Sequence, residues 1–184
     1  HTRTRRQRQM CIRDRLTIIL FTIMSTKTVK ASKSNFITLK TSKGSIIIKT
    51  LPKIAPNHVK RIKELVSSGF YNGIIFHRVI EGFMAQTGDP LGNGTGGSGK
   101  NLKAEFSDYK YKYGTVGMAR SMNPDSGDSQ FFICFDGCGH LTGQYTVWGQ
   151  VETGMEVVEK IEIGEPPSNP DQIIEAFVGK KKTK

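Results

Sequence analysis

The sequence has few of the features that mark several large classes of protein. Its three cysteines, Cys11, Cys134 and Cys138, are too few for the disulfide framework of a small secreted domain. Cys134 and Cys138 stand four residues apart with no second Cys or His pair nearby, so we expect no metal site and interpret Cys134 as a small buried apolar residue. The sequence also contains no internal repeat and no apolar run of the ~20 residues that a transmembrane helix needs. We therefore expect one domain without a membrane span.

Basic residues outnumber acidic ones by 27 to 16, but they are concentrated at the two ends of the chain. Residues 1–23 hold six arginines against one acidic residue, and residues 180–184 hold four lysines. The chain between these segments is nearly neutral, whereas a nucleic-acid-binding domain gathers its basic residues on one folded face. We therefore expect no nucleic-acid partner, and we expect residues 180–184 to form a solvated basic tail.

The first 23 residues have two interpretations. An Arg-rich start followed by the apolar run 16–23 has the layout of a secretory signal, although Lys27 and Lys30 place charge near the cleavage region. The stretch "TRTRRQRQMCIRDR" also resembles the translated read-through of a sequencing adapter, with translation starting at Met24. We adopt the second interpretation, which predicts a cytoplasmic protein. The alternative predicts a periplasmic or secreted one.

The remaining chain divides into a flexible segment over residues 24–34 and a domain over residues 35–179, and the domain begins with a hairpin and a helix. "NFITLKTSKGSIIIKTLP" contains two β-rich runs separated by a turn in which Gly44 supplies the permissive residue. In "APNHVKRIKELVSSGFYNG" the apolar residues fall on one helical face, with Pro56 near the start and Gly69 at the end. The sequence therefore predicts a β-hairpin followed by an amphipathic helix.

Short β-rich segments dominate the rest of the domain. They are "IIFHRVIEGFMAQTGDP", interrupted by Gly82, and then "TVGMAR", "SQFFICF", "YTVWGQV" and "QIIEAFV". A second helix is predicted over "GMEVVEKIEIG", where Val157, Val158 and Ile161 share a face. Many short strands with only two helices predict a mainly β protein, a closed antiparallel barrel capped by two α-helices.

The glycine-rich segment "GNGTGGSGKN" at 92–101 fits two nucleotide-binding patterns incompletely. Such loops work when they leave a strand and open a helix whose N-terminus holds the phosphates. The sequence that follows has no apolar helical stripe, and Asn101 stands where a Ser or Thr would hold magnesium. We therefore interpret the segment as a long surface loop and expect no nucleotide cofactor.

Several segments resemble signature segments of the cyclophilins, the peptidyl-prolyl cis/trans isomerases. They are "FHRVIEGFMAQTGDP" at 76–90, "GNGTGG" at 92–97, "SQFFICF" at 129–135 and "YTVWGQV" at 145–151, and the match runs in order from Phe36 to Val178. The phrase "GMAR...SQFFICF...LTGQYTVWG" is closer to bacterial-type members than to the common cytosolic animal type. The resemblance implies an eight-stranded antiparallel barrel with a helix at each end and a catalytic groove on its outer face. It also implies a monomer that acts on proline-containing peptides and flexible protein segments without a cofactor.

The same resemblance assigns site residues position by position. It makes Arg78 the catalytic arginine and Gln86 the group that holds the substrate backbone. The substrate-binding positions are Phe83, Met84, Gly94, Ala119, Arg120, Gln130, Phe132, His140, Leu141 and Tyr145. Three positions depart from the commonest pattern: Arg120 replaces Asn, His140 replaces a frequent Trp and Tyr145 replaces a frequent His. Because that Trp is associated with cyclosporin binding, the resemblance implies weak inhibition by this drug.

The chemistry of X-Pro rotation needs residues of these types. A barrier of ~18–20 kcal/mol opposes rotation about a peptide bond, and no bond has to break. An enzyme must stabilise the twisted amide more than either planar form. When the amide twists, the imide nitrogen regains its lone pair and can accept a hydrogen bond. A guanidinium suits this role because it keeps its proton and offers several N–H donors in a rigid plane. Alternation in "SQFFICF" places Phe131 in the interior and Phe132 in the groove.

Other functions compete with this one. A binding module or assembly chaperone for proline peptides would use the same groove with incidental turnover. A hydrolase would need His77 as base and Ser129 as nucleophile, with Asp89 or Asp125 as the orienting group, and the local spacing does not require that arrangement. A nucleic-acid binder using residues 180–184 would lose affinity steeply with salt.

Overall fold

Residues 34–180 are described by a computed structural model of the chain. The predicted leader over residues 1–23, the segment 24–33, Cys11 and residues 181–184 lie outside the described residues, so the predictions about them stay predictions. Lys180 is described, and it is paired. Its ammonium group forms an ion pair with Glu152 and lies 3.9 Å from the centroid of the Phe36 ring.

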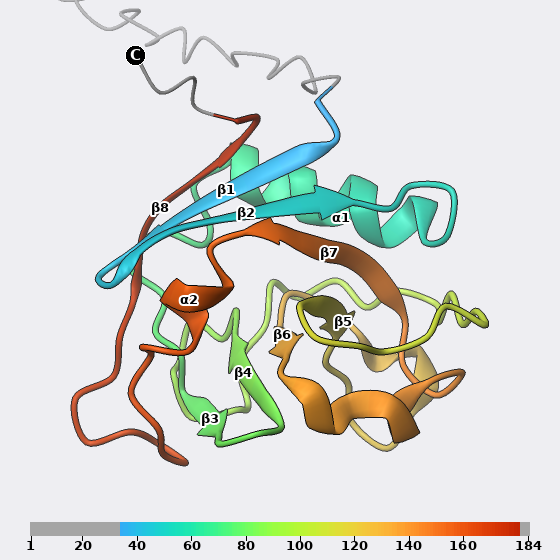
Figure 1. Ribbon diagram of the computed structural model, residues 1–184. Coiled ribbons are helices and arrows are strands. Elements are labelled where there is room, and N and C mark those ends of the chain that lie inside the picture. The colour runs from blue at the N-terminus through green and yellow to red at the C-terminus, as the bar shows by residue number, and fades with distance from the viewer. Residues whose placement is uncertain (1–33, 181–184) are drawn as a thin grey trace, which may run out of the picture. The chain divides into compact units, whose positions relative to one another are not determined.

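Eight antiparallel strands form one sheet in the order β3-β4-β6-β5-β7-β2-β1-β8 (Figure 1). The mainly β fold predicted from the sequence is confirmed, and each predicted β-rich segment contributes to the sheet. The strands are β1 Phe36–Thr41, β2 Gly44–Thr50, β3 Arg78–Ile80, β4 Met84–Thr87, β5 Thr115–Met118, β6 Phe131–Cys134, β7 Val147–Thr153 and β8 Ile173–Val178.

The predicted hairpin is strands β1 and β2, paired from Phe36↔Lys49 to Thr41↔Gly44. Ile37 and Leu39 of β1 and the alternate residues Ile46 and Ile48 of β2 are buried, which is the pattern of strands with one face on the core. Gly44 has a φ of 140°, a conformation that a side chain would strain. The turn therefore forms where the sequence predicts it.

The predicted first helix is α1, Pro56–Ser67, and it buries the expected face of Val59, Ile62, Leu65 and Val66. No side chain of the helix caps its own first turn. The carboxylate of Glu105, from a distant loop, accepts hydrogen bonds from the backbone N–H groups at positions 57 and 58, at 3.1 and 3.0 Å. A remote acidic residue thus satisfies the helix N-terminus, where negative charge is favourable.

The second helix is shorter than predicted. α2 comprises only Met155–Val158, and the chain then continues in hydrogen-bonded turns that still bury Ile161. Two short 3₁₀ helices, Pro124–Ser126 and Asp136–Leu141, complete the helical segments of the described residues. The apolar face at 157, 158 and 161 was predicted correctly, but a turn is enough to bury it.

The predicted closed barrel is wrong, because the sheet curls without closing. Its edge strands β3 and β8 are joined by no ladder. Within residues 34–180 these two sides are linked by the isolated bridges Val79↔Gly164 and Ile75↔Gln172 and by a bond from the N–H of Gly73 to the carbonyl of Ile173. The segment that would complete the ladder holds Pro166, Pro167 and Pro170, and proline has no N–H to donate.

The two faces of the sheet pack differently. On one face Val79, Ala85, Ile133 and Val116 stand opposite one another on adjacent strands and belong to the large hydrophobic core. Trp148 lies fully buried in that core, so it is a packing residue. The other face carries a smaller buried cluster of Met84, Tyr111, Phe132, Cys134, Cys138, Leu141 and Val147. This second cluster underlies the candidate site.

Cys134 is buried as predicted, but the expectation that it is an unpaired apolar residue is wrong. Cys134 and Cys138 form a disulfide, with their Cα atoms 6.0 Å apart. The 3₁₀ helix that follows β6 turns the chain back and brings Cys138 within the Cα separation that a disulfide requires. The short sequence spacing did not reveal this turn.

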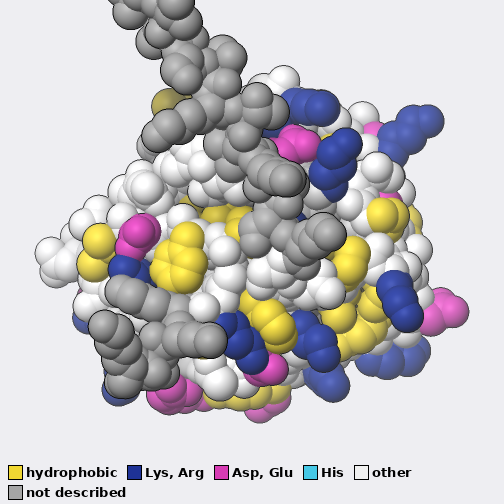
Figure 2. All heavy atoms as spheres, turned by 90° about the horizontal axis from the view of Figure 1, so that it is seen from above, with side chains coloured by type: hydrophobic (Ala, Val, Ile, Leu, Met, Phe, Trp, Pro, Cys, Tyr) yellow, Lys and Arg dark blue, Asp and Glu magenta, His cyan; other side chains and the backbone are white. Residues whose placement is uncertain are grey.

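One face of the described residues carries charged side chains of both signs. On the face shown in Figure 2, Lys and Arg side chains alternate with Asp and Glu side chains, and hydrophobic side chains lie between them. None of the helices within residues 34–180 combines the length and apolar character needed to cross a bilayer.

Candidate active site

A row of residues on four adjacent strands forms the base of the candidate site. Arg78 of β3 stands opposite Gln86 of β4, Gln86 opposite Phe132 of β6, and Phe132 opposite Gly117 of β5. Directly opposed residues in antiparallel strands present their side chains on the same face of the sheet. The pairing therefore brings residues from distant parts of the sequence together on the face away from the large core.

An open cavity of about 310 Å³ lies over this row. Its lining includes Arg78 and Gln86, together with apolar groups from the sheet and from the 3₁₀ helix Asp136–Leu141. All ten lining residues were predicted from the sequence: Arg78, Phe83, Met84, Gln86, Ala119, Arg120, Phe132, His140, Leu141 and Tyr145. The cavity thus joins a cationic side chain to an apolar floor.

Aromatic rings build the floor and rim of this cavity. The His140 ring stacks on the Phe83 ring with centroids 5.6 Å apart, and the Tyr145 ring meets the Phe132 ring edge-on at 5.8 Å. Beneath them Tyr111 stacks on Phe132 at 5.9 Å. As predicted, Phe132 faces this side of the sheet and Phe131 lies in the large core.

Gly117 leaves the space that the Tyr111 and Phe132 rings occupy. A Cβ at this position would lie 2.5 Å from Cζ of Phe132 and closer still to the Tyr111 hydroxyl oxygen. Such distances are far below ordinary contact, so glycine is needed here for packing. Burial raises the pKa of the Tyr111 hydroxyl, and the nearby Tyr145 hydroxyl adds to this. Tyr111 therefore serves as a neutral support under the floor.

Arg120 lines the rim of the cavity, at the position where the resemblance implies Asn. Its guanidinium lies 4.4 Å from the centroid of the Tyr145 ring. It also donates hydrogen bonds to the backbone carbonyls of Gln144, at 3.0 Å, and Ser121, at 2.9 Å. These contacts hold the Arg120 side chain against the loop that carries Tyr145. Arg120 and Tyr145, two of the three residues that depart from the commonest pattern, therefore pack against each other.

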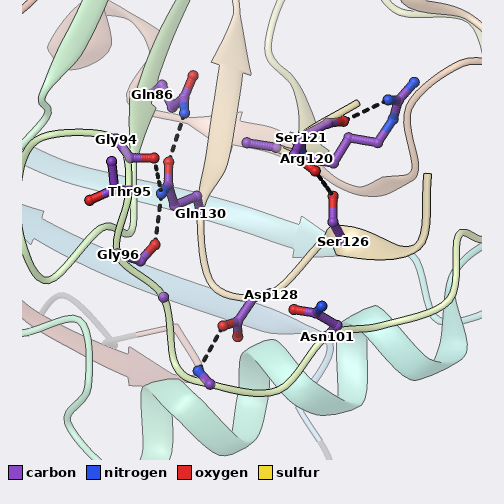
Figure 3. A pocket seen from close by; sticks show the side chains of 13 residues that line it. Gln86, Gly94, Thr95, Gly96, Asn101, Arg120, Ser121, Ser126, Asp128 and Gln130 are labelled. Carbon is purple, nitrogen blue, oxygen red and sulfur yellow. Dashed lines mark hydrogen bonds between the residues drawn. The ribbon is translucent and has the colours of Figure 1, made fainter. Parts of the chain in front are cut away.

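A second cavity of about 480 Å³ adjoins the first and shares Gln86, Ala119 and Arg120 with it. Gly94 and Gln130, the remaining two predicted site residues, line this second cavity. Figure 3 shows Gln130 between Gln86 and the glycine-rich loop. The Gln130 side chain accepts a hydrogen bond from Gln86 at 2.9 Å and donates to the carbonyls of Gly94 and Gly96. The glycine-rich segment is thus a loop that borders the groove, as predicted.

Asp89 anchors this loop from within. Its buried carboxylate accepts hydrogen bonds from the backbone N–H groups of Leu91, Asn93 and Gly94, at 2.8, 3.0 and 2.5 Å. Burial alone would raise the pKa of Asp89, but these bonds, and one from the N–H of Gly96, lower the pKa below its ordinary value. The loop amides therefore surround a carboxylate of the protein itself, and no phosphate is needed to explain the loop.

The arrangement required by a hydrolase does not form. The Ser129 hydroxyl donates to the carbonyl of Gly88 at 2.8 Å, and within the described residues neither ring nitrogen of His77 has a hydrogen-bond partner. Burial lowers the pKa of His77, which favours a neutral ring. His77 and Ser129 are therefore structural residues beside the groove.

Three residues that shape the site, Asp89, Tyr111 and Glu165, were not predicted from the sequence to have these roles. Asp89 could have been found, since an Asp before a glycine-rich turn commonly accepts bonds from nearby backbone amides. Tyr111 and Glu165 gave no local signal. Tyr111 supports Phe132, and Glu165 forms an ion pair with Arg78 from 87 positions further along the chain. Only the folded chain brings these pairs together.

A family model described as cyclophilin type peptidyl-prolyl cis-trans isomerase/CLD matches residues 36–178. The chain belongs to this family. The resemblance seen in the signature segments is thereby confirmed, and the groove described above is the outer face of a cyclophilin.

Relatives and solved cyclophilins support the same assignment. A Brucella abortus protein named "Probable peptidyl-prolyl cis-trans isomerase" is 46% identical over 188 residues, covering 91% of this chain and 96% of the relative. A Helicobacter pylori peptidyl-prolyl cis-trans isomerase is 43% identical, and the match covers 76% of this chain and 87% of the relative.

Among solved structures, a Cryptosporidium parvum cyclophilin in the presence of the dipeptide Ala-Pro has a TM-score of 0.74 at 28% identity. The match covers 79% of this chain and 99% of that chain. Cyclophilin AquaCyp293 from Hirschia baltica has a TM-score of 0.72 at 29% identity, with 80% and 75% coverage.

Proposed function

We propose that this cyclophilin catalyses cis-trans rotation about X-Pro bonds in flexible protein segments and so assists their folding. One observation carries the proposal: a single cavity joins the guanidinium of Arg78 to an apolar floor of Phe83, Met84, Phe132 and Leu141. A proline ring needs the apolar surface, and a twisting amide needs the donor. The C. parvum cyclophilin studied with Ala-Pro supports a proline peptide as the occupant.

In this mechanism the floor holds the proline ring while the preceding carbonyl turns. Burying the ring is worth ~1.5–3 kcal/mol in both isomers, so it supplies binding more than acceleration. Arg78 supplies the acceleration. As the amide twists, the imide nitrogen becomes pyramidal and regains a lone pair, and an N–H of Arg78 donates to it. Because this acceptor is available only in the twisted state, the bond lowers the barrier.

Gln86 holds the peptide backbone during the rotation. Its amide can both donate and accept, and it lies beside Arg78 in the cross-strand row and at the junction of the two cavities. The proline would occupy the smaller cavity, and the chain before it would run along the larger one past Gly94. The φ of 88° at Gly94 favours glycine, and nothing lies within 4 Å of where its Cβ would be. A peptide can therefore approach the backbone closely there.

The experiment compares wild type with Arg78→Ala in a protease-coupled proline-peptide assay. Loss of one transition-state donor commonly costs about 10²–10³-fold in rate, so kcat/KM should fall by about that factor. Lys160→Ala, which removes an exposed cation outside both cavities, serves as the control and should keep the wild-type rate. Equal rates for wild type and Arg78→Ala would defeat the catalytic assignment.

A proline-peptide binding module with incidental turnover is the second candidate, because the apolar floor would serve it equally well. It predicts that Arg78→Ala keeps peptide affinity and that cellular function survives the loss of rate. Complementation with Arg78→Ala separates the two functions. We also propose that the protein acts as a cytoplasmic monomer without nucleic acid or membrane. The adapter interpretation of residues 1–23 supports the compartment.

A further inference from the structure

Glu165 stands directly across from the catalytic arginine. Val79 and Gly164 form an antiparallel bridge in which each N–H donates to the other's carbonyl, at 2.8 and 3.0 Å. In this register the residue before Val79 lies opposite the residue after Gly164, so Arg78 and Glu165 are cross-strand neighbours. Glu165 thus extends the row of Arg78, Gln86 and Phe132 by one more residue.

The contact between the two side chains uses a particular part of the guanidinium. Nε of Arg78 donates to Oε2 of Glu165 at 2.7 Å. Within residues 34–180 neither terminal nitrogen of Arg78 has a hydrogen-bond partner, so their four N–H groups are available to other acceptors. Arg78 lines the proline cavity whereas Glu165 does not. The carboxylate therefore holds the guanidinium from outside the site.

The segment that carries Glu165 is itself held in place. Gly164 has a φ of 155°, and a Cβ there would lie 2.5 Å from Cα of Pro167, so the chain bends tightly at this glycine. Pro166 and Pro167 fix two consecutive φ angles after Glu165. The buried Asp171 accepts a hydrogen bond from the N–H of Glu162 at 2.9 Å and one from the Ser42 hydroxyl at 2.5 Å. Glu165 is therefore presented from a segment anchored on both sides.

We infer that Glu165 is a positioning residue for Arg78. By accepting the Nε–H it fixes the plane of the guanidinium, so that the terminal N–H groups face the substrate amide. An arginine side chain otherwise samples many rotamers, and holding it in place before substrate arrives lowers the entropy lost in the transition state. This inference rests on the proposed isomerase function.

A double-mutant cycle tests the inference. Both side chains are partly exposed, 41% for Arg78 and 51% for Glu165, and exposed pairs have modest effects. We expect Glu165→Ala to lower kcat by about two- to fivefold at low salt with little change in KM. Glu165→Gln keeps an oxygen that can accept the Nε–H, so it should retain more activity than Glu165→Ala. In an Arg78→Ala background, measured by NMR exchange at high enzyme concentration, Glu165→Ala should have no further effect.

The control is Glu162→Ala, which removes a carboxylate from the same segment. No ion pair of Glu162 occurs in the described part of the chain, and its removal should leave kcat unchanged. An NMR signal from the Arg78 side-chain Nε–H should be sharp in wild type and broadened in Glu165→Ala. An equal loss of kcat in the wild-type and Arg78→Ala backgrounds would overturn the inference, as would an unchanged or raised kcat in Glu165→Ala. Full activity of Arg78→Ala would instead overturn the proposed function.

Discussion

Gln86 donates a hydrogen bond from Nε2 to Oε1 of Gln130 at 2.9 Å. Gln130 in turn donates to the carbonyls of Gly94 and Gly96 at 3.0 and 2.8 Å. The chain of bonds runs from Gln86, which lines both cavities, to the loop that borders the groove (Figure 3). The position of Gln86 and the path of the loop are therefore linked through one side chain.

Replacement of Gln130 should affect both partners. Gln130→Ala removes all three hydrogen bonds, each worth about 0.5–1.5 kcal/mol, and we expect kcat/KM on proline peptides to fall about tenfold. Amide signals of Gly94 and Gly96 should show increased mobility by NMR relaxation. Gln130→Glu is the matched variant: it can still accept from Gln86 but cannot donate to the loop, so it should mobilise the loop in the same way. A rigid loop in both variants would contradict the link.

Asp89 should make stability depend on pH. Its pKa is lower in the folded protein than the unfolded value near 3.9, so the stabilisation is fully present above that value. It is lost as the pH falls through the folded pKa, because protonation removes the acceptor of the loop amides. Asp89→Asn introduces an NH₂ group that faces those amides, and we expect it to lower the free energy of unfolding by about 3 kcal/mol at pH 7.

Urea denaturation of wild type and Asp89→Asn across the pH range measures this effect. The difference in free energy of unfolding between wild type and Asp89→Asn should be constant around neutral pH and should become smaller below pH ~4. Asp108→Asn removes an acidic residue for which the structure gives no hydrogen bond to the loop at 89–96, and it should show no such pH dependence. A pH-independent difference for Asp89→Asn would contradict the assignment.

His140 should set the response to cyclosporin. The family resemblance associates a Trp at this position with binding of the drug, and here a smaller ring stacks on Phe83 at the cavity rim. We expect weak inhibition of wild type and at least tenfold tighter inhibition of His140→Trp, which corresponds to ~1.4 kcal/mol. His140→Phe keeps the stacking without the indole and should remain weakly inhibited. Tight inhibition of wild type would refute the expectation.

The disulfide should couple redox state to stability. It closes only a short loop, for which chain entropy gives a stabilisation of about 2 kcal/mol. The free energy of unfolding of Cys138→Ser, measured under non-reducing conditions, should be lower than that of wild type by about this amount. It should equal the free energy of unfolding of reduced wild type. Rapid alkylation of cell extracts followed by mass spectrometry of the 134–138 peptide would also report the compartment. A reducing cytoplasm should give alkylated thiols, and an oxidising compartment should give the bond.

Periodicity predicted the parts of the fold that depend on local pattern. The β1–β2 hairpin, the buried face of α1 and the opposite orientations of Phe131 and Phe132 all follow from which residues must be buried. Closure of the sheet did not follow, because it depends on whether two distant edges can exchange hydrogen bonds. Prolines in the segment 164–172 prevent a full ladder there.

The candidate site was predictable to a similar extent. The family resemblance assigned every residue that lines the smaller cavity. Six of the ten lie within the four signature segments, three more lie within the bacterial-type phrase, and His140 follows from the register between them. The supports of the site were not identified. Glu165 and Tyr111 act through contacts made across the sheet or beneath it, and such contacts depend on register and on the space left by Gly117. Register across distant strands is a property of the folded chain.

The cross-strand row of Arg78, Gln86 and Phe132 limits the insertions and deletions that this enzyme can accept. Along β4 and β6 the groove residues Gln86 and Phe132 alternate with the core residues Ala85 and Ile133. A one-residue insertion in either strand would exchange the two sets, placing a polar amide in the core and an aliphatic side chain in the groove. The cross-strand row therefore cannot shift in register without disrupting the core. New substrate preferences are expected at the rim, where Arg120, His140 and Tyr145 line the cavity and already depart from the commonest family pattern.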